Sequence, residues 1–149
     1  HRQEAGSNEV VVVVKPWSEE RCPELSPVYR KLLEEYLEPF RLINTRVRIV
    51  SPRYVGVEVY GRLKLRQDTP AVRRAVRECL QQEIRGKSFG AVISYGKLYT
   101  ALENLEGVEK VRELHLERTG SAAEKNNRGD LLLREDALAY LKESDFEFC

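Results

Sequence analysis

Apolar side chains recur along the chain at two different spacings, and each spacing indicates a different kind of element. The β-branched run Val10 to Val14 has no polar alternation, which favours a strand covered on both faces. Apolar and charged residues alternate around Val47 and Ile49, and alternate again from Val55 to Leu65. A period of two residues predicts a strand in each segment. Gly61, on the apolar side of the longer segment, leaves room for a bulge or a closely packed helix.

Two helices are predicted where a hydroxyl residue directly precedes a proline. Ser26 stands before Pro27, and Thr69 stands before Pro70. A hydroxyl can cap the first helical turn, and the missing N–H of proline costs nothing at the first helical position. We expect the first helix to pack on a sheet through the apolar stripe Leu32, Leu33, Tyr36, Leu37 and Phe40. The second helix carries the stripe Val72, Ala75, Val76, Cys79, Leu80 and Ile84.

The rest of the chain predicts shorter elements. Ser94 can cap a short third helix that ends at Gly107, and a strand follows over Val111 to Leu116. The polar stretch Thr119 to Asp130 indicates a mobile loop. Beyond it, the sequence predicts short strands at Leu131 to Leu133 and at Phe146 to Phe148, on either side of Ala137 to Leu141.

This order of elements indicates an α+β fold. A split β-α-β pattern predicts a ferredoxin-like β-α-β-β-α-β sandwich, with a short extra helix and a small C-terminal β extension. Such an architecture hosts many unrelated activities, so it does not by itself give a function. The expected organisation is a disordered leader or tag remnant over 1–8, the ferredoxin-like domain over 9–118, a polar loop over 119–129 and the β extension over 130–149.

Composition narrows the classes of function. The 149 residues include 25 basic and 24 acidic ones, so the whole-chain charge of +1 will not hold nucleic acid or an anionic membrane nonspecifically. The longest apolar run is far shorter than the ~20 residues of a membrane span. The chain lacks methionine and starts at His1. We therefore expect a fragment of a longer protein, the alternative being that modified methionines are missing from the sequence.

Candidate chemistry is sparse. Gly86-Lys87-Ser88 is similar to the end of a phosphate-binding loop, but Gln81 stands where that motif needs an earlier glycine. His115 is the only histidine outside the polar leader, and its neighbours alternate in charge as on a solvated strand face. The three cysteines Cys22, Cys79 and Cys149 form no CxxC pair. We expect no enzymatic activity, metal, cofactor or small-molecule substrate.

One charged surface is the strongest candidate for recognition. The predicted sheet face carries Arg46, Arg48, Tyr60, Arg62 and Lys64. Domains of this architecture that bind RNA stack bases on aromatic residues of that face, so nucleic-acid binding is the alternative hypothesis. The acidic neighbours Glu58, Glu113 and Glu117 oppose phosphate and favour cross-strand ion pairing on an exposed or protein-covered sheet. Trp17, in a proline-containing loop, is either at the edge of the core or an interface anchor.

Three stretches resemble the baseplate J-like family. Leu37 to Leu42 followed by Thr45 to Val57 is similar to a helix that ends near proline and leads to V-x-V-x-x-P-x-Y-V-x-V, with Ile49 at the second valine. Phe89-Gly90 and the residues up to Val108 resemble that family's F-G … L-x-x-A-L … G-V stretch. The tail from Gly129 to Phe148 is similar to its terminal strand segment, while the polar insertion Thr119 to Arg128 departs from the family picture.

The resemblance covers most of the chain from Val10 onward and is to the C-terminal region of the family, which occurs in phage tails and contractile injection systems. It implies a structural subunit of the baseplate wedge, with other baseplate or tail proteins, or further copies of itself, as partners. It also implies assembly in the bacterial cytoplasm and a final place in the baseplate of the particle. The family has no known catalytic residues, so none is carried over.

Overall fold

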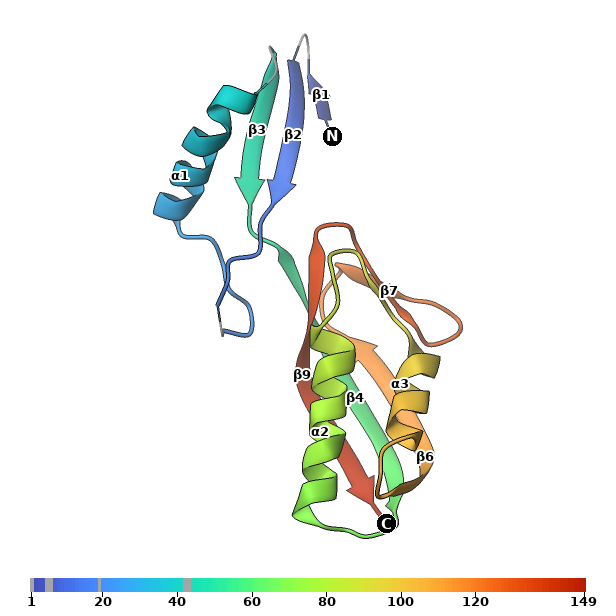
Figure 1. Cartoon of the computed structure of the whole chain (residues 1–149). Helices are drawn as coiled ribbons and strands as arrows, with labels where there is room; N and C mark the ends of the chain where they lie inside the picture. Colours follow the sequence, from blue (N-terminus) through green and yellow to red (C-terminus); the bar gives the residue numbers. More distant parts are fainter. Residues whose placement is uncertain (1, 5–6, 19, 42–43) are drawn as a thin grey trace. The chain divides into compact units, whose positions relative to one another are not determined.

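In the computed structural model, which describes residues 2–4, 7–18, 20–41 and 44–149, the chain divides into two units, His1–Pro52 and Arg53–Cys149 (Figure 1). The division falls inside the segment 9–118 that the sequence analysis assigns to one domain. Pro52 at the junction lacks an N–H, so it cannot extend a strand ladder from one side to the other. Two strands that are neighbours in sequence thereby enter different sheets.

A parallel crossover builds the first unit. Its elements are strands β1 (Arg2–Glu4) and β2 (Ser7–Val13), helix α1 (Pro27–Leu37), the 3-10 turn η1 (Glu38–Phe40) and strand β3 (Thr45–Val50). β1 pairs with β2 in antiparallel fashion, and β2 pairs with β3 in parallel. A parallel pair needs a crossover connection, and α1 provides it while lying alongside β3 (Figure 1).

The start of α1 agrees with the sequence prediction, but its packing does not. The Ser26 hydroxyl accepts the N–H of Tyr29 at 3.1 Å, and Pro27 is the first helical residue. None of the residues of α1 is buried. Of the predicted stripe, Leu33 and Leu37 are half-buried, and the rest is exposed: Leu32, Tyr36 and Phe40. The stripe is wider than the line of contact with β3, so the sheet covers only part of it.

Two further expectations for this unit are corrected. The leader over 1–8 is not disordered throughout, because Arg2–Glu4 pairs with Ser7–Glu9 as a hairpin; residues 1, 5 and 6 lie outside the described part. Backbone hydrogen bonds stabilise such a pair without apolar burial. The β-branched run is not covered on both faces either. Val11 pairs with Arg48 on the face opposite Ile49, and Val11 stays 37% exposed.

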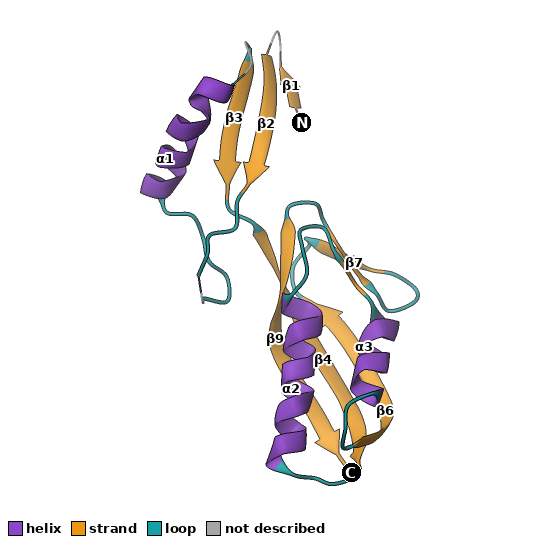
Figure 2. Cartoon of the chain, in the orientation of Figure 1, coloured by secondary structure: helices purple, strands orange, loops and turns teal. Residues whose placement is uncertain are grey.

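The second unit contains two sheets and two helices of more than one turn. Its elements are β4 (Arg53–Leu65), α2 (Pro70–Arg85), β5 (Val92–Ile93), α3 (Tyr95–Glu103), β6 (Val108–Arg118), β7 (Ala123–Lys125), β8 (Leu131–Leu133) and β9 (Ala137–Phe148). The main sheet has the order β6-β4-β9, with β4 antiparallel to β6 and parallel to β9. The small sheet has the order β5-β8-β7. α2 and α3 lie together on one face of the main sheet (Figure 2).

The core lies between these helices and the main sheet. The predicted alternation along β4 is confirmed, because Val55, Val57, Val59 and Leu63 are fully buried. Val76, Leu80 and Ile84 of α2, Leu98 and Leu102 of α3 and Ile93 and Leu131 of the small sheet complete the cluster. Gly61 occupies a point of close backbone approach, and the β4–β6 register shifts between Arg62 and Leu63. Of the two alternatives, a bulge or a closely packed helix, this shift agrees with a bulge or an irregular pairing near the glycine.

The α+β class is confirmed, whereas the ferredoxin-like topology is not. That topology requires β2, β3, β4 and β6 in one sheet, but β2 and β3 pair in the first unit and β4 in the second. The predicted small C-terminal extension is also larger than expected, because Ala137–Phe148 is one strand of the main sheet. Polar residues over 142–145 concealed its continuity. Ala122 and Ala123, at the start of the predicted polar loop, are buried in the core cluster.

Candidate interaction surface

The structure separates the charged residues that the sequence analysis placed on one face. Arg46 and Arg48 lie on β3 in the first unit, whereas Tyr60, Arg62 and Lys64 lie on β4 in the second. The prediction of a single shared sheet face is therefore wrong. The predicted ferredoxin-like fold places the strands on either side of Ser51-Pro52-Arg53 in one sheet, but this segment passes from one sheet to another.

In the first unit, Trp17 and the two arginines are accessible. Trp17 follows β2 and is 98% exposed, so it does not belong to the edge of a core within its own unit. Arg46 and Arg48 are both exposed. Arg48 Nε lies 3.1 Å from Glu9 Oε1, across the β2–β3 pair. A fully exposed tryptophan is rare on a protein surface, because burial of its large apolar area lowers the free energy.

In the second unit, the side of the main sheet away from the helices forms a charged sheet face. We define it as Glu58, Tyr60, Arg62 and Lys64 of β4 together with the residues of β6 and β9 that flank them. Ion pairs cross between strands on this face: Arg62 Nη2 to Glu147 at 3.1 Å, Lys64 Nζ to Glu109 at 3.6 Å and Lys142 Nζ to Glu58 at 3.5 Å. Cross-strand ion pairing is the arrangement that the sequence analysis favoured for this face.

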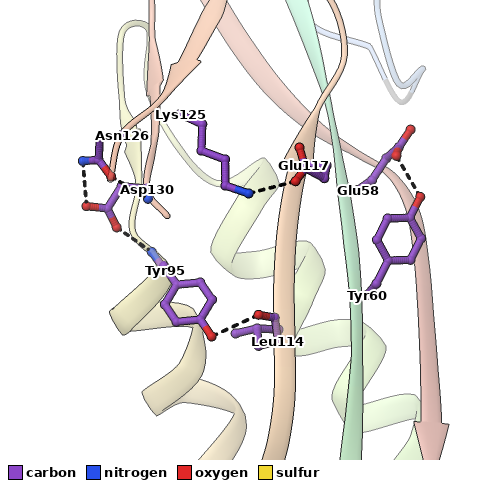
Figure 3. A network of polar contacts seen from close by, with 8 residues as sticks. All are labelled: Glu58, Tyr60, Tyr95, Leu114, Glu117, Lys125, Asn126 and Asp130. Carbon is purple, nitrogen blue, oxygen red and sulfur yellow. Dashed lines mark hydrogen bonds and ion pairs between the residues drawn. The ribbon is translucent and has the colours of Figure 1, made fainter. Parts of the chain in front are cut away.

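Tyr60 is held in an acidic setting. Its hydroxyl donates a 2.7 Å hydrogen bond to Glu58 Oε2 (Figure 3). This bond, with partial desolvation and the negative charges of Glu58, Glu143 and Asp145, raises the pKa of Tyr60 to about 12. Carboxylates around the ring repel a phosphate backbone, and they oppose the base stacking on which the nucleic-acid hypothesis depends.

A second polar network fixes the loop between β7 and β8. Asp130 accepts the backbone N–H of Tyr95 at 2.9 Å and the side-chain N–H of Asn126 at 3.2 Å (Figure 3). The Asn126 Oδ1 accepts the backbone N–H groups of Arg128 and Asp130, each at 2.9 Å. The hydrogen bond from Tyr95 is the largest cause that lowers the pKa of the Asp130 carboxyl. The sequence analysis read this stretch as mobile and missed the network, although an asparagine before a glycine-containing turn is a signal for such a loop.

The first unit also carries an apolar surface that the sequence analysis assigned to the core. Exposed fractions along α1 and the following turn are 72% for Val28, 48% for Tyr29, 57% for Leu32, 70% for Tyr36 and 72% for Phe40. We name these five residues the α1 apolar face. The sequence pattern detected most of them as a helical stripe, but it could not tell a stripe covered by the chain's own sheet from one left open.

The residues considered for chemistry come from different parts of the chain. His115 is exposed on β6, Cys22 and Cys79 are half-buried, Cys149 is exposed, and no disulfide joins these three described cysteines. Burial of Cys79 against the core, and then the charge of Glu83, raises the pKa of its thiol, which disfavours the thiolate. Nowhere in the described ranges do three or more His, Cys, Asp or Glu residues gather as metal ligands. Within the same ranges, every helix falls short of the length and apolarity that a membrane span needs.

Comparison with known proteins finds a match in three-dimensional structure and none in sequence. No family model matches the chain, and no curated protein matches it. Among solved structures, the chain is similar to one chain of the cryo-EM structure of the anti-feeding prophage baseplate, six-fold symmetrised, with a TM-score of 0.69 and 15% sequence identity. The match covers 94% of this chain and 30% of that one. The chain therefore shares the fold of less than a third of a longer baseplate chain.

Proposed function

We propose that this chain is a non-catalytic, structural interaction module of a phage-like tail baseplate. Within the baseplate we assign it to the wedge, as part of a protein similar to the J-like family, with other baseplate or tail proteins as partners. It would assemble in the bacterial cytoplasm and remain in the baseplate of the finished particle. The module that we propose for this role consists of two small α+β units.

The observation that carries the proposal is the extent of the structural likeness. The match to the anti-feeding prophage baseplate chain covers 94% of the residues at a TM-score of 0.69, so it includes residues of both units. At 15% identity the likeness shows the fold, and the step from fold to role is our inference. Sequence stretches similar to the J-like family point to the same kind of particle independently of that match.

The surfaces of the two units suit protein contacts better than chemistry. Trp17 is a large apolar side chain in solvent, and such residues are typical anchors of interfaces. The charged sheet face presents ion-paired side chains that would fix the register of a partner rather than supply most of the affinity. Arg46 and Arg48 of the first unit, and Tyr60, Arg62 and Lys64 of the second, are the residues we assign to such contacts.

Localisation within the particle tests the proposal. Tailed particles would be purified from the organism that encodes the chain, and an antibody against residues 53–149 would be located by immunogold electron microscopy. We expect gold at one end of the tail, where the baseplate lies, and none along the sheath. A matched preparation from a deletion strain controls for antibody specificity. Absence of the protein from purified particles, or labelling along the whole sheath, would contradict the proposal.

An assembly experiment tests the residues. A strain with Trp17→Ala is expected to yield fewer complete particles, because an interface anchor is lost while the fold of both units is retained. Val92→Ala provides the matched control, since Val92 is also an exposed apolar residue, in the second unit. Equal particle yields from the two variants would remove Trp17 from the interaction surface without affecting the baseplate assignment.

A further inference from the structure

The α1 apolar face follows one line along the helix. At about 100° of rotation per residue, Val28, Leu32 and Tyr36 fall within an arc of about 80°. Tyr29 lies beside this arc, and the half-buried Leu33 and Leu37 continue it toward β3. The apolar surface of the helix is thus wider than the part that the sheet covers, and the uncovered part is continuous.

The size of this face is that of an interface. Tyr36 and Phe40 are 70% and 72% exposed, and with roughly 200 Å² for each aromatic side chain they leave roughly 300 Å² in water. Tyr29, Leu32 and Val28 bring the total to about 500–600 Å². That is at the upper limit of the largest apolar patch on a typical monomer, and it approaches the ~800 Å² that each partner buries in a stable complex.

The order of basic and acidic residues along α1 is the reverse of the order that stabilises an isolated helix. Acidic residues stabilise the first turn of a helix and basic residues the last, but α1 has neither. Its basic residues Arg30 and Lys31 precede its acidic residues Glu34 and Glu35, and Glu38 follows the helix. In the described part of the chain, no ion-pair partner lies within 4 Å of Lys31 or Glu35. A charge order of this kind becomes favourable when a second helix lies alongside in the opposite direction.

We propose that the α1 apolar face packs against the same face of a second copy of this chain, with the two α1 helices antiparallel. The twofold axis passes near Leu32 and Leu33, so that Leu32 of one copy meets Leu32 of the other and Val28 meets Tyr36. Lys31 and Glu35 border the same edge of the face, and the axis brings Lys31 of each copy opposite Glu35 of its partner. The interface is isologous and complementary to itself in both shape and charge.

This inference does not depend on the proposed function. It rests on the exposed residues of α1 and on the order of its charged residues, whatever the assembly to which the chain belongs. If the baseplate proposal is also correct, the contact joins neighbouring copies of the protein. The two proposals fail separately, because self-association is measured on the purified chain and localisation on the particle.

Sedimentation equilibrium of the purified 149-residue chain over a wide concentration range tests the pairing. We expect a monomer–dimer equilibrium that weakens with added salt, since the flanking charges contribute to it. Leu32→Glu places a charge on the axis and should raise the dissociation constant at least tenfold. Val92→Glu, at an exposed apolar position of β5, is the matched control and should leave the constant unchanged. Circular dichroism of each variant verifies that the fold is retained.

Reversal of the charges decides the orientation. Lys31→Glu and Glu35→Lys should each weaken the dimer, and the double variant should restore it, because only an antiparallel pair brings these two positions together across the interface. A monomer at all concentrations would overturn the proposal. So would a dimer that Leu32→Glu leaves intact, because the contact between the two copies would then lie elsewhere on the chain.

Discussion

Tyr60 and Glu58 lie two residues apart on β4, and the tyrosine hydroxyl donates a 2.7 Å hydrogen bond to the glutamate carboxylate. The period of a strand places both side chains on the same face of the sheet. The bond keeps Tyr60 protonated and Glu58 ionised, so it raises the pKa of the phenol and is the largest cause that lowers the pKa of the carboxyl. The charged sheet face therefore has a titration behaviour that can be measured.

Ultraviolet titration should show a late step with a pKa of about 12 that belongs to Tyr60. Burial also raises the pKa of Tyr99 above its ordinary value. Glu58→Gln should lower the pKa of Tyr60, because the negative acceptor is lost, and Tyr60→Phe should remove the late step and so assign it. A raised pKa means that the folded state retains the proton longer than the unfolded chain. The stabilisation is thus complete below the ordinary pKa of about 10 and is lost as the pH rises toward 12. Persistence of the step at about 12 in Tyr60→Phe would contradict the assignment.

The same surroundings predict that the chain does not bind single-stranded RNA. Glu58, Glu143 and Asp145 all lie close enough to Tyr60 to affect its titration, and they would repel the backbone of any strand stacked on the ring. Fluorescence anisotropy with a labelled RNA at low salt should show no saturable binding. Salt-sensitive binding that weakens on Tyr60→Ala would reverse this conclusion and restore the nucleic-acid hypothesis.

Gly61 and Gly96 should respond to alanine in opposite directions. A Cβ at Gly61 would overlap the backbone carbonyl of Glu113 and approach Phe146 to 2.9 Å, so Gly61→Ala should cost about 1–3 kcal/mol of stability. Gly96 lies in the first turn of α3, with only the Ser94 hydroxyl within 4 Å of the added carbon. Gly96→Ala should therefore stabilise by about 0.5 kcal/mol. Chemical denaturation measures both, and equal effects would show that the close approach at Gly61 is not maintained.

Asp130 should make the second unit more stable at neutral pH than in acid. Its pKa is lowered from 3.8, first by the backbone N–H of Tyr95 and then by the side chain of Asn126. A depressed pKa gives stability that is present above the ordinary carboxyl pKa and lost as the pH falls through the folded value. Asp130→Ala should lower the melting temperature at pH 7, and the difference from the parent chain should shrink near pH 3.

Asp130→Asn is the matched control for that experiment, because it keeps an acceptor for Tyr95 while removing the charge. We expect a melting temperature between those of the parent chain and the alanine variant. A constant difference between parent and Asp130→Ala from pH 7 to pH 3 would show that the charge of the carboxylate does not contribute.

Local signals in the sequence predicted local structure well. Ser26 and Thr69 cap α1 and α2 through their hydroxyls, and the alternation on β4 separates buried valines from charged neighbours, as the patterns indicate. These features depend on residues within one element. A cap, a period and a proline are all read from a few adjacent positions, so their physical causes are visible in the sequence.

Pairing between distant segments could not be predicted in the same way. The stretch over 142–145 belongs to an edge strand of the main sheet, where polar residues are tolerated, and nothing local shows that its backbone pairs with β4. Likewise, Arg46 and Arg62 look equivalent in sequence, yet the Pro52 junction places them in different units. The placement of these residues on one shared sheet face was therefore wrong, and their role in an interaction surface stays a prediction.

The parallel pairing of β4 with β9 also determines when the main sheet of the second unit can be completed. Arg62 and Glu147 contact each other although they are 85 residues apart in the chain. Closure of so long a loop is entropically costly and slow, and β9 must pair along its whole length up to Phe148. On the ribosome, β4, α2, α3 and β6 leave the exit tunnel before their central sheet can be completed. During that interval the edge of β4 that later pairs with β9 is unpaired, and the apolar residues of β4 are incompletely covered. A chaperone would bind the second unit most readily in this period.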